Sequence, residues 1–216
     1  MKNLVTLRFM LVSLFAIMSM AVSANIIYST VDGFRYKLDT EAKTAELAKY
    51  YGSATEVSIS ESVTYEGVVY SVTSLGGDCF SSCSSLASIN IPSSVTSLGG
   101  GCFMGCSSLT SINIPSSVTS LGDNCFRACS SLTSINIPSS VTSLGGWCFA
   151  SCSSLASINI PSSVTSLGRS CFSWCSSLAS INIPSSVTSL GEKCFWYCIY
   201  NHRTTKTNQK YPSVNL

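Results

Sequence analysis

Apolar and polar positions alternate in short stretches along residues 79–198, and the same arrangement returns many times. In its first copy Leu86, Ile89 and Ile91 are apolar, and Ser88 and Asn90 alternate with the isoleucines. Alternation with β-branched residues predicts a short strand whose isoleucines point inward. The serine and asparagine side chains of this strand are therefore expected to meet solvent.

The rest of the unit predicts a second strand and the turns that connect the two. Pro92 ends the first strand, because proline cannot donate to a sheet ladder. Val95 and Leu98 predict another short extended stretch, and Gly99 begins the turn that returns the chain. The segment Cys-Phe-x-x-Cys-Ser-Ser-Leu has room for about one helical or 3₁₀ turn, which would place both cysteines and the leucine on one side.

The unit repeats with a period of 23 residues. Each of six copies begins with Cys-Phe, at Cys79, Cys102, Cys125, Cys148, Cys171 and Cys194, and five complete units end at Lys193. A unit of this size cannot bury its own apolar face, whereas stacked units bury one another's. The fixed period therefore predicts a solenoid.

The segment Cys106–Gly122 and its copies resemble the leucine-rich repeat family in its BspA-like bacterial surface-antigen form. The resemblance covers residues 79–198 and a degenerate copy upstream; one departure is the cysteine before each phenylalanine, where the family usually has alanine. It implies a leucine-rich repeat solenoid, with parallel stacked β-strands and short helical or 3₁₀ turns on the convex side. It also implies no intrinsic catalysis and a surface used for adhesion or protein binding.

Residues 1–24 have the features of a secretory signal peptide. Lys2 and Arg8 precede an apolar run at residues 9–18, and small residues lead to a predicted cleavage site after Ala24. We therefore expect a secreted or cell-surface protein. No later segment has 18 uninterrupted apolar residues, so no transmembrane segment is expected once the leader is removed.

Residues 25–78 are expected to form an amino-terminal β-hairpin cap with a degenerate first repeat. Val57–Val63 resembles the strand of a repeat, and Tyr65–Tyr70 predicts a hairpin inserted after it. The alternating segment Phe34–Leu38 predicts an amphipathic strand. Residues 41–51 have helical propensity, but the family resemblance favours a strand that pairs with the preceding one.

Residues 79–198 then form the repeat array, and residues 199–216 form a polar, basic tail. The repeat pattern breaks after Cys198, so the last unit would end at an open sheet face. Such ends pair with other chains unless they are blocked. End-to-end self-association, or fraying of the last unit, is expected.

Charge and the scarcity of histidine exclude two function classes. The chain has 12 basic and 10 acidic side chains, which does not give the strong positive field that nucleic-acid binding needs. The single histidine, His202, lies in the tail and cannot anchor a Ser-His-Asp or Cys-His arrangement. We expect neither an enzyme nor a bound cofactor.

The cysteines have three open explanations: buried thiols that fill the core, disulfides between neighbouring units, or metal ligands. Equivalent residues of stacked strands lie about 4.8 Å apart, which suits a disulfide, whereas the spacing is loose for zinc. A structural or metal/redox protein built on this array is therefore the alternative function. The candidate residues are Cys79, Cys83, Cys102, Cys106, Cys125, Cys129, Cys148, Cys152, Cys171, Cys175, Cys194 and Cys198.

Two surfaces are candidates for binding a protein or glycan partner. The first is a flat, neutral array on the strand face, comprising Ser111, Asn113, Ser134, Asn136, Ser157 and Asn159. The second is the set Trp147, Trp174 and Trp196, which occupy positions that differ between copies. Exposed aromatic residues favour interfaces. The alternatives are a merely soluble strand face and tryptophans packed under a loop.

Overall fold

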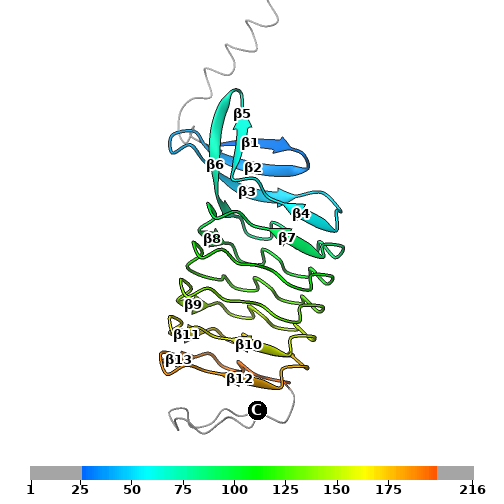
Figure 1. Ribbon diagram of the computed structural model, residues 1–216, viewed down its shortest axis with the longest axis vertical. Coiled ribbons are helices and arrows are strands. Elements are labelled where there is room, and N and C mark those ends of the chain that lie inside the picture. Colours follow the sequence, from blue (N-terminus) through cyan, green and yellow to red (C-terminus); the bar gives the residue numbers. More distant parts are fainter. Residues whose placement is uncertain (1–25, 199–216) are drawn as a thin grey trace, which may run out of the picture.

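The computed structural model describes residues 26–198, which form thirteen strands arranged as a stack of narrow coils below an amino-terminal sheet (Figure 1). The amino-terminal strands are β1 (Ile26–Val31), β2 (Phe34–Asp39), β3 (Thr44–Tyr50), β4 (Glu56–Ser58), β5 (Ser62–Tyr65) and β6 (Val68–Leu75). The strands of the repeats are β7 (Ser88–Asn90), β8 (Ser97–Leu98), β9 (Ser143–Leu144), β10 (Ser157–Asn159), β11 (Ser166–Leu167), β12 (Ser180–Asn182) and β13 (Ser189–Leu190).

The amino-terminal sheet is mixed, with the order β1-β2-β3-β6-β5 and a parallel pairing of β3 with β6 at its centre, and it is parallel where it meets the repeats. Strands β1, β2 and β3 pair antiparallel in that order, so residues 44–50 form a strand, as the family resemblance favoured. Strands β5 and β6 also pair antiparallel, across the turn at Glu66 and Gly67. Strand β4 then pairs in parallel with β7, and β6 with β8. The degenerate copy is thus in register with the first true repeat.

Each repeat contributes one short extended segment to each of two parallel columns. One column holds the Ser-Ile-Asn segments, where Ser157 lies opposite Ser180. The other holds the Ser-Leu segments, where Leu144 lies opposite Leu167. In the middle repeats the pairing is reduced to single bridges, such as Asn113 with Asn136. The isoleucines face the core and the alternating residues face solvent; the predicted pair of strands is present in the first, fourth and fifth units, whereas the second unit has only bridges and the third has one strand.

The predicted helical or 3₁₀ turn at Cys-Phe-x-x-Cys is wrong, because residues 26–198 contain no helix and this segment is a series of β-turns. Its alternate N–H groups donate to the next repeat instead of continuing along their own segment. The N–H of Phe80 donates to the carbonyl of Cys102 at 2.8 Å, and that of Ser82 to the carbonyl of Met104 at 2.7 Å. These bonds join the turns of successive repeats and leave a helix without its donors.

A single column of aromatic rings runs through the core. Phe80, Phe103, Phe126, Phe149, Phe172 and Phe195 stack with centroids 5.4–5.5 Å apart and planes within 11° of parallel. Tyr50 of the amino-terminal sheet continues this column, 5.2 Å from Phe80. The backbone N–H of Tyr50 also donates to the carbonyl of Cys79, as the phenylalanines from Phe80 to Phe172 do to the cysteine of the next repeat. The amino-terminal sheet therefore covers the first repeat through the same ring stacking and backbone hydrogen bond that one repeat makes with the next.

Gly168 occupies a position where a side chain has no room. A Cβ there would overlap the backbone of Gly145 and Gly146 in the preceding repeat, and backbone atoms cannot rotate away. At Gly146 a Cβ would lie 3.5 Å from its nearest neighbours, the carbonyl oxygen of Arg169 and the carboxylate of Asp123.

We expect Gly168→Ala to lower the free energy of unfolding by about 3 kcal/mol, because the two repeats must separate locally. Gly146→Ala, the matched control, should change it by less than about 0.5 kcal/mol. Denaturant titration of both variants measures the difference. Equal stability of the two would contradict the close approach at Gly168.

Candidate partner-binding surface

Two residues of every repeat have a left-handed backbone, one immediately before each cysteine. In the third repeat they are Asn124 and Ala128, with φ of 58° and 59°. Glycine, asparagine and aspartate adopt this conformation readily, and several repeats have one of them there. The turns thus place two such residues of every repeat on the same edge of the stack, and Ser170 is the one among them whose side chain is buried.

Large aromatic residues occupy this strained position in the last three repeats. Trp147, Trp174 and Tyr197 have φ of 53°, 62° and 57°. A bulky side chain in this region costs on the order of 1–3 kcal/mol, and such strain gathers at functional sites. The packing of the repeats does not require these rings, since Asn124 and Ser151 take equivalent places in other copies.

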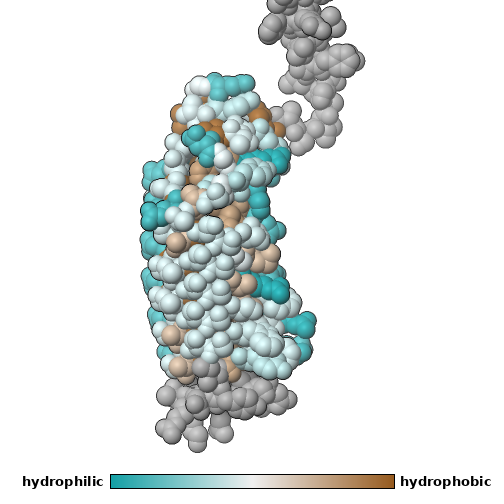
Figure 2. Space-filling model, turned by 90° about the vertical axis from the view of Figure 1, so that its right-hand side faces the viewer, coloured by the Kyte–Doolittle hydropathy of each residue, from teal (hydrophilic) through white to brown (hydrophobic). Residues whose placement is uncertain are grey.

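The structure brings the three tryptophans together around one open hollow of about 220 Å³. Trp174 and Trp196 meet edge to face at 6.0 Å, and Tyr197 stacks on Trp174 at 4.1 Å. Trp174 is 50% exposed and Trp196 38% exposed, so neither is packed under a loop. Figure 2 shows teal and pale groups projecting from one edge of the repeats nearest the grey carboxyl-terminal residues.

Cations lie beside the rings. The guanidinium of Arg169 is 5.5 Å from the ring centre of Trp147, and the ammonium of Lys193 is 4.8 Å from that of Trp196. Arg127 also lines the hollow and donates to the side chain of Asn124 at 3.3 Å. These three are all the basic residues of the repeat array. The hollow therefore combines an aromatic wall with a local positive field.

The two acids of the array do not neutralise this field by direct contact. The carboxylate of Asp123 accepts the N–H of Gly146 at 2.6 Å, and Glu192 is exposed. Within residues 26–198 neither forms a salt bridge with the three cations. No salt bridge within the described residues therefore neutralises the three cations at the hollow.

Two buried serines line the same hollow. Ser170 is 5% exposed and Ser173 3% exposed, and they are the only buried polar side chains of the described residues. The hydroxyl of Ser173 donates to the carbonyl of Ser170 at 3.0 Å. Ser170 thus contributes a second buried hydroxyl to the lining of the hollow.

The predicted surface of serines and asparagines on the strand face is a separate face of the solenoid. Ser111, Asn113, Ser134, Asn136, Ser157 and Asn159 are all exposed, and the asparagines lie one above another in the parallel column. The face carries no charge, and none of its residues lines the hollow. The tryptophans and these serines and asparagines therefore belong to two different sites.

The cysteines are thiols in the structure, and eleven of them are buried. From Cys106 onward, the second cysteine of each repeat donates to the phenylalanine carbonyl of the preceding repeat. The Sγ of Cys129, for example, lies 3.2 Å from the carbonyl oxygen of Phe103. Burial raises the pKa of Cys129 to about 12, despite the opposing effect of a backbone hydrogen bond at Cys106. Such thiols are poor nucleophiles at neutral pH.

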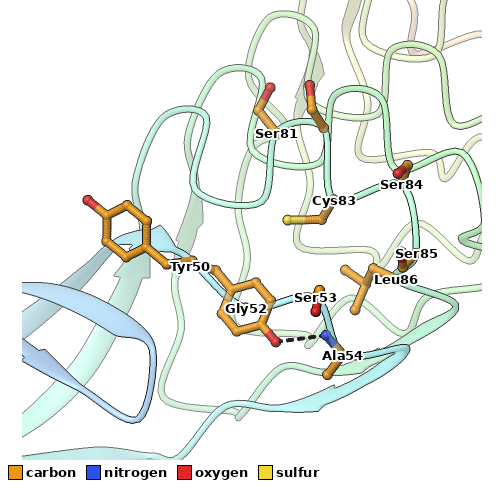
Figure 3. A pocket seen from close by; sticks show the side chains of 11 residues that line it. Tyr50, Gly52, Ser53, Ala54, Ser81, Cys83, Ser84, Ser85 and Leu86 are labelled. Atoms are coloured by element: carbon orange, nitrogen blue, oxygen red, sulfur yellow. Dashed lines mark hydrogen bonds between the residues drawn. The ribbon is translucent and has the colours of Figure 1, made fainter.

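Cys83 is the exception, because the first repeat has no preceding phenylalanine carbonyl. It is half-buried and lines a hollow of about 270 Å³ between the amino-terminal sheet and the first repeat. Tyr50 lines the same hollow, and its hydroxyl accepts the N–H of Ala54 at 3.3 Å, as the dashed line in Figure 3 marks. Burial raises the pKa of Cys83, and Lys49 opposes this shift.

Neither a metal centre nor a membrane span is found in the described part of the chain. No three histidine, cysteine or acidic side chains of residues 26–198 are grouped so that they could hold a metal ion. No helix there has the length and apolar character needed to cross a bilayer. The tail and its predicted self-association, like the leader, lie outside the described residues.

Sequence analysis found the three tryptophans but not the groups around them. Arg127, Arg169, Lys193 and Tyr197 also lie at positions that differ between copies, but no local pattern in the sequence links them to the tryptophans. Arg169 follows Trp147 by 22 residues, almost one period, and this spacing places the two side chains in neighbouring repeats. A comparison of positions one period apart would have shown that the array's cations and tryptophans converge.

Solved structures of bacterial leucine-rich repeat proteins resemble this fold. The chain is 27% identical to a leucine rich repeat protein of T. pallidum, with a TM-score of 0.66, covering 76% of this chain and 82% of that one. It is 28% identical to a leucine rich cell surface protein of Faecalibacterium prausnitzii A2-165, with a TM-score of 0.64, covering 80% of this chain and 52% of that one. No curated protein sequence matches.

The chain thus spans most of the T. pallidum protein and about half of the Faecalibacterium one. The BspA type leucine rich repeat region matches residues 73–202 in six copies, which is more than half of the sequence. Its copies correspond to the six coils that the phenylalanine column joins. The chain therefore belongs to the BspA type leucine rich repeat family.

Proposed function

We propose that this protein is a secreted or cell-surface adhesion module that binds a partner, without catalysis, through the hollow around its tryptophans. The observation that carries the proposal is the convergence of all three tryptophans and all three array cations on one exposed site. Aromatic residues and arginine are the residue types that dominate binding energy at interfaces. The strained backbone beneath Trp147 and Trp174 is further support.

Exposure of the protein outside the cell is supported by the predicted leader and by the Faecalibacterium neighbour, which is described as a cell surface protein. The neutral strand face is the weaker candidate site. It has neither charge nor an aromatic side chain, so it offers hydrogen bonds that water can replace.

The test compares binding of two variants to immobilised extracellular-matrix proteins and glycans. The first carries Trp147→Asn, Trp174→Ser and Trp196→Ser, each replacement being the residue of the preceding repeat at the equivalent position. The second carries Ser111→Ala, Ser134→Ala and Ser157→Ala on the strand face. We expect the tryptophan variant to lose at least about tenfold in affinity, and the serine variant to keep it.

Stability serves as the internal control. Because asparagine suits a left-handed backbone better than tryptophan does, the first variant should unfold at the same or a higher denaturant concentration. Lost binding in a stable protein then reports on the rings themselves. Unchanged binding of the tryptophan variant, with loss in the serine variant, would move the site to the strand face.

A further inference from the structure

We infer that the hollow binds a negatively charged sugar unit of a glycan, carboxylated or sulfated. This inference rests on the proposed function and names the class of partner. The size of the hollow limits the size of its ligand. The hollow, at about 220 Å³, is smaller than the roughly 300–1,000 Å³ of sites for drug-sized ligands, so it suits one ring-sized group.

Charge selects an anion. Arg127, Arg169 and Lys193 surround the hollow without a salt bridge to a described carboxylate. Arginine in particular presents a planar set of donors that matches carboxylate and sulfate-like oxygens. Lys193 adds a point charge from the last repeat.

The rings and the buried hydroxyl select a sugar over a simple anion. Trp174 and Tyr197 stack to form an exposed aromatic platform, against which the apolar face of a sugar ring can lie. Ser170 lines the same hollow, and its hydroxyl, which can both donate and accept, can pair with a hydroxyl of the sugar. An acidic peptide side chain would satisfy the cations but leave the platform uncovered.

The surroundings also favour a compact ligand over a folded protein. A stable protein partner buries about 800 Å² on each side, with several anchor residues. Beyond the hollow, the same edge of the first two repeats carries mostly glycine and serine, such as Gly100, Gly101, Gly105 and Ser82. Those side chains provide no anchors that would extend the interface.

The experiment measures binding of the purified protein to four immobilised polymers by surface plasmon resonance. Polygalacturonate carries carboxylated sugars, heparin carries sulfated ones, dextran is a neutral polysaccharide, and poly-glutamate has charge without sugar. We expect polygalacturonate, heparin or both to bind at least tenfold more tightly than dextran and poly-glutamate. Binding to polygalacturonate would identify a carboxylated sugar as the ligand, and binding to heparin a sulfated one.

Two single variants and one control locate the binding. Trp174→Ser removes the platform, and Arg169→Gly removes one cation; Ser151 and Gly146 hold these equivalent positions one repeat earlier. Each should weaken binding to the acidic polysaccharide about tenfold. Ser134→Ala, on the strand face, should leave it unchanged.

Failure of the sugar inference differs from failure of the proposed function. If poly-glutamate binds as tightly as the acidic polysaccharides, or if neither of these binds, the sugar inference is overturned, while loss of matrix binding in the tryptophan variant would still support the proposed function. If acidic polysaccharides bind equally well to Trp174→Ser and Arg169→Gly, the hollow is not their site.

Discussion

The reduced protein is expected to unfold cooperatively as the pH rises above about 9. Besides Cys83, eight thiols have a raised pKa, chiefly because of burial, except that at Cys175 a hydrogen bond with Cys198 comes first and lowers the pKa of Cys198 in turn. They are Cys102, Cys106, Cys125, Cys129, Cys148, Cys152, Cys171 and Cys175. The unfolded chain releases these protons near pH 8.5–9, whereas the folded chain keeps them to higher pH.

Stability falls as the pH rises because the pKa values of these thiols are higher in the folded protein than in the unfolded chain. A folded-state pKa above the unfolded one gives stability that is complete below the unfolded value and is lost as the pH rises toward the folded one. Above about pH 9 each such thiol removes up to about 1.4 kcal/mol per pH unit. Over one pH unit, eight such thiols together remove about as much free energy as the whole stability of a typical domain, about 5–15 kcal/mol.

Circular dichroism between pH 7 and 11, with reductant present, measures this transition. A Cys125→Ala and Cys148→Ala variant controls for the tyrosines and lysines that also titrate there, and its loss of stability with pH should be shallower by about 1.4 kcal/mol per pH unit for each thiol removed. Thiol titration of the denatured protein, made without reductant, should find twelve thiols. A protein that resists pH 10 and yields none would have its cysteines in disulfides.

Phe126→Ala is expected to lower the free energy of unfolding by about 3–5 kcal/mol. Phe126 is fully buried and stacks on Phe103 and Phe149, so its loss opens a cavity in the middle of the aromatic column. Each repeat contacts only its neighbours, so no other element can close that gap. Guanidinium titration measures the change.

Phe126 lies in the middle of the aromatic column, and this leads to a second expected result. A break at the third repeat weakens the coupling between the halves of the stack, so two unfolding transitions should replace one. Ser134→Ala, exposed in the same repeat, is the control and should change stability by less than about 0.5 kcal/mol. If Phe126→Ala lowered the free energy of unfolding by less than about 1 kcal/mol, the stacked rings would not be a main source of the stability of the repeats.

The pattern of apolar and polar residues within one unit was enough to predict the strands, but not the conformation of the turns. Ile89 and Ile91 alternate with polar residues, so their strand followed from the sequence, as did the register imposed by the period. The Cys-Phe turn was assigned helical character because its spacing allows a helix. The deciding hydrogen bonds, such as that from Phe80 to Cys102, run between repeats and leave no mark in a single unit.

The site was only half predictable for a similar reason. Trp147 stood out because tryptophan is rare and the other copies lack it. Its partner Arg169 belongs to the next repeat, and Ser170 looks like any other serine until the stack buries it. Contacts across the stacking direction depend on how repeats lie on each other, which composition and local spacing do not describe.

The aromatic column also bears on how this protein can change its length. Every internal junction between Phe103 and Phe172 repeats the same geometry, so a chain shortened or extended by 23 residues meets no new packing problem. Gene duplication could therefore lengthen the molecule in steps of one coil while the amino-terminal sheet stays as it is. The hollow, made by residues of the last repeats, would move outward with each added coil and hold its ligand farther from the amino-terminal end.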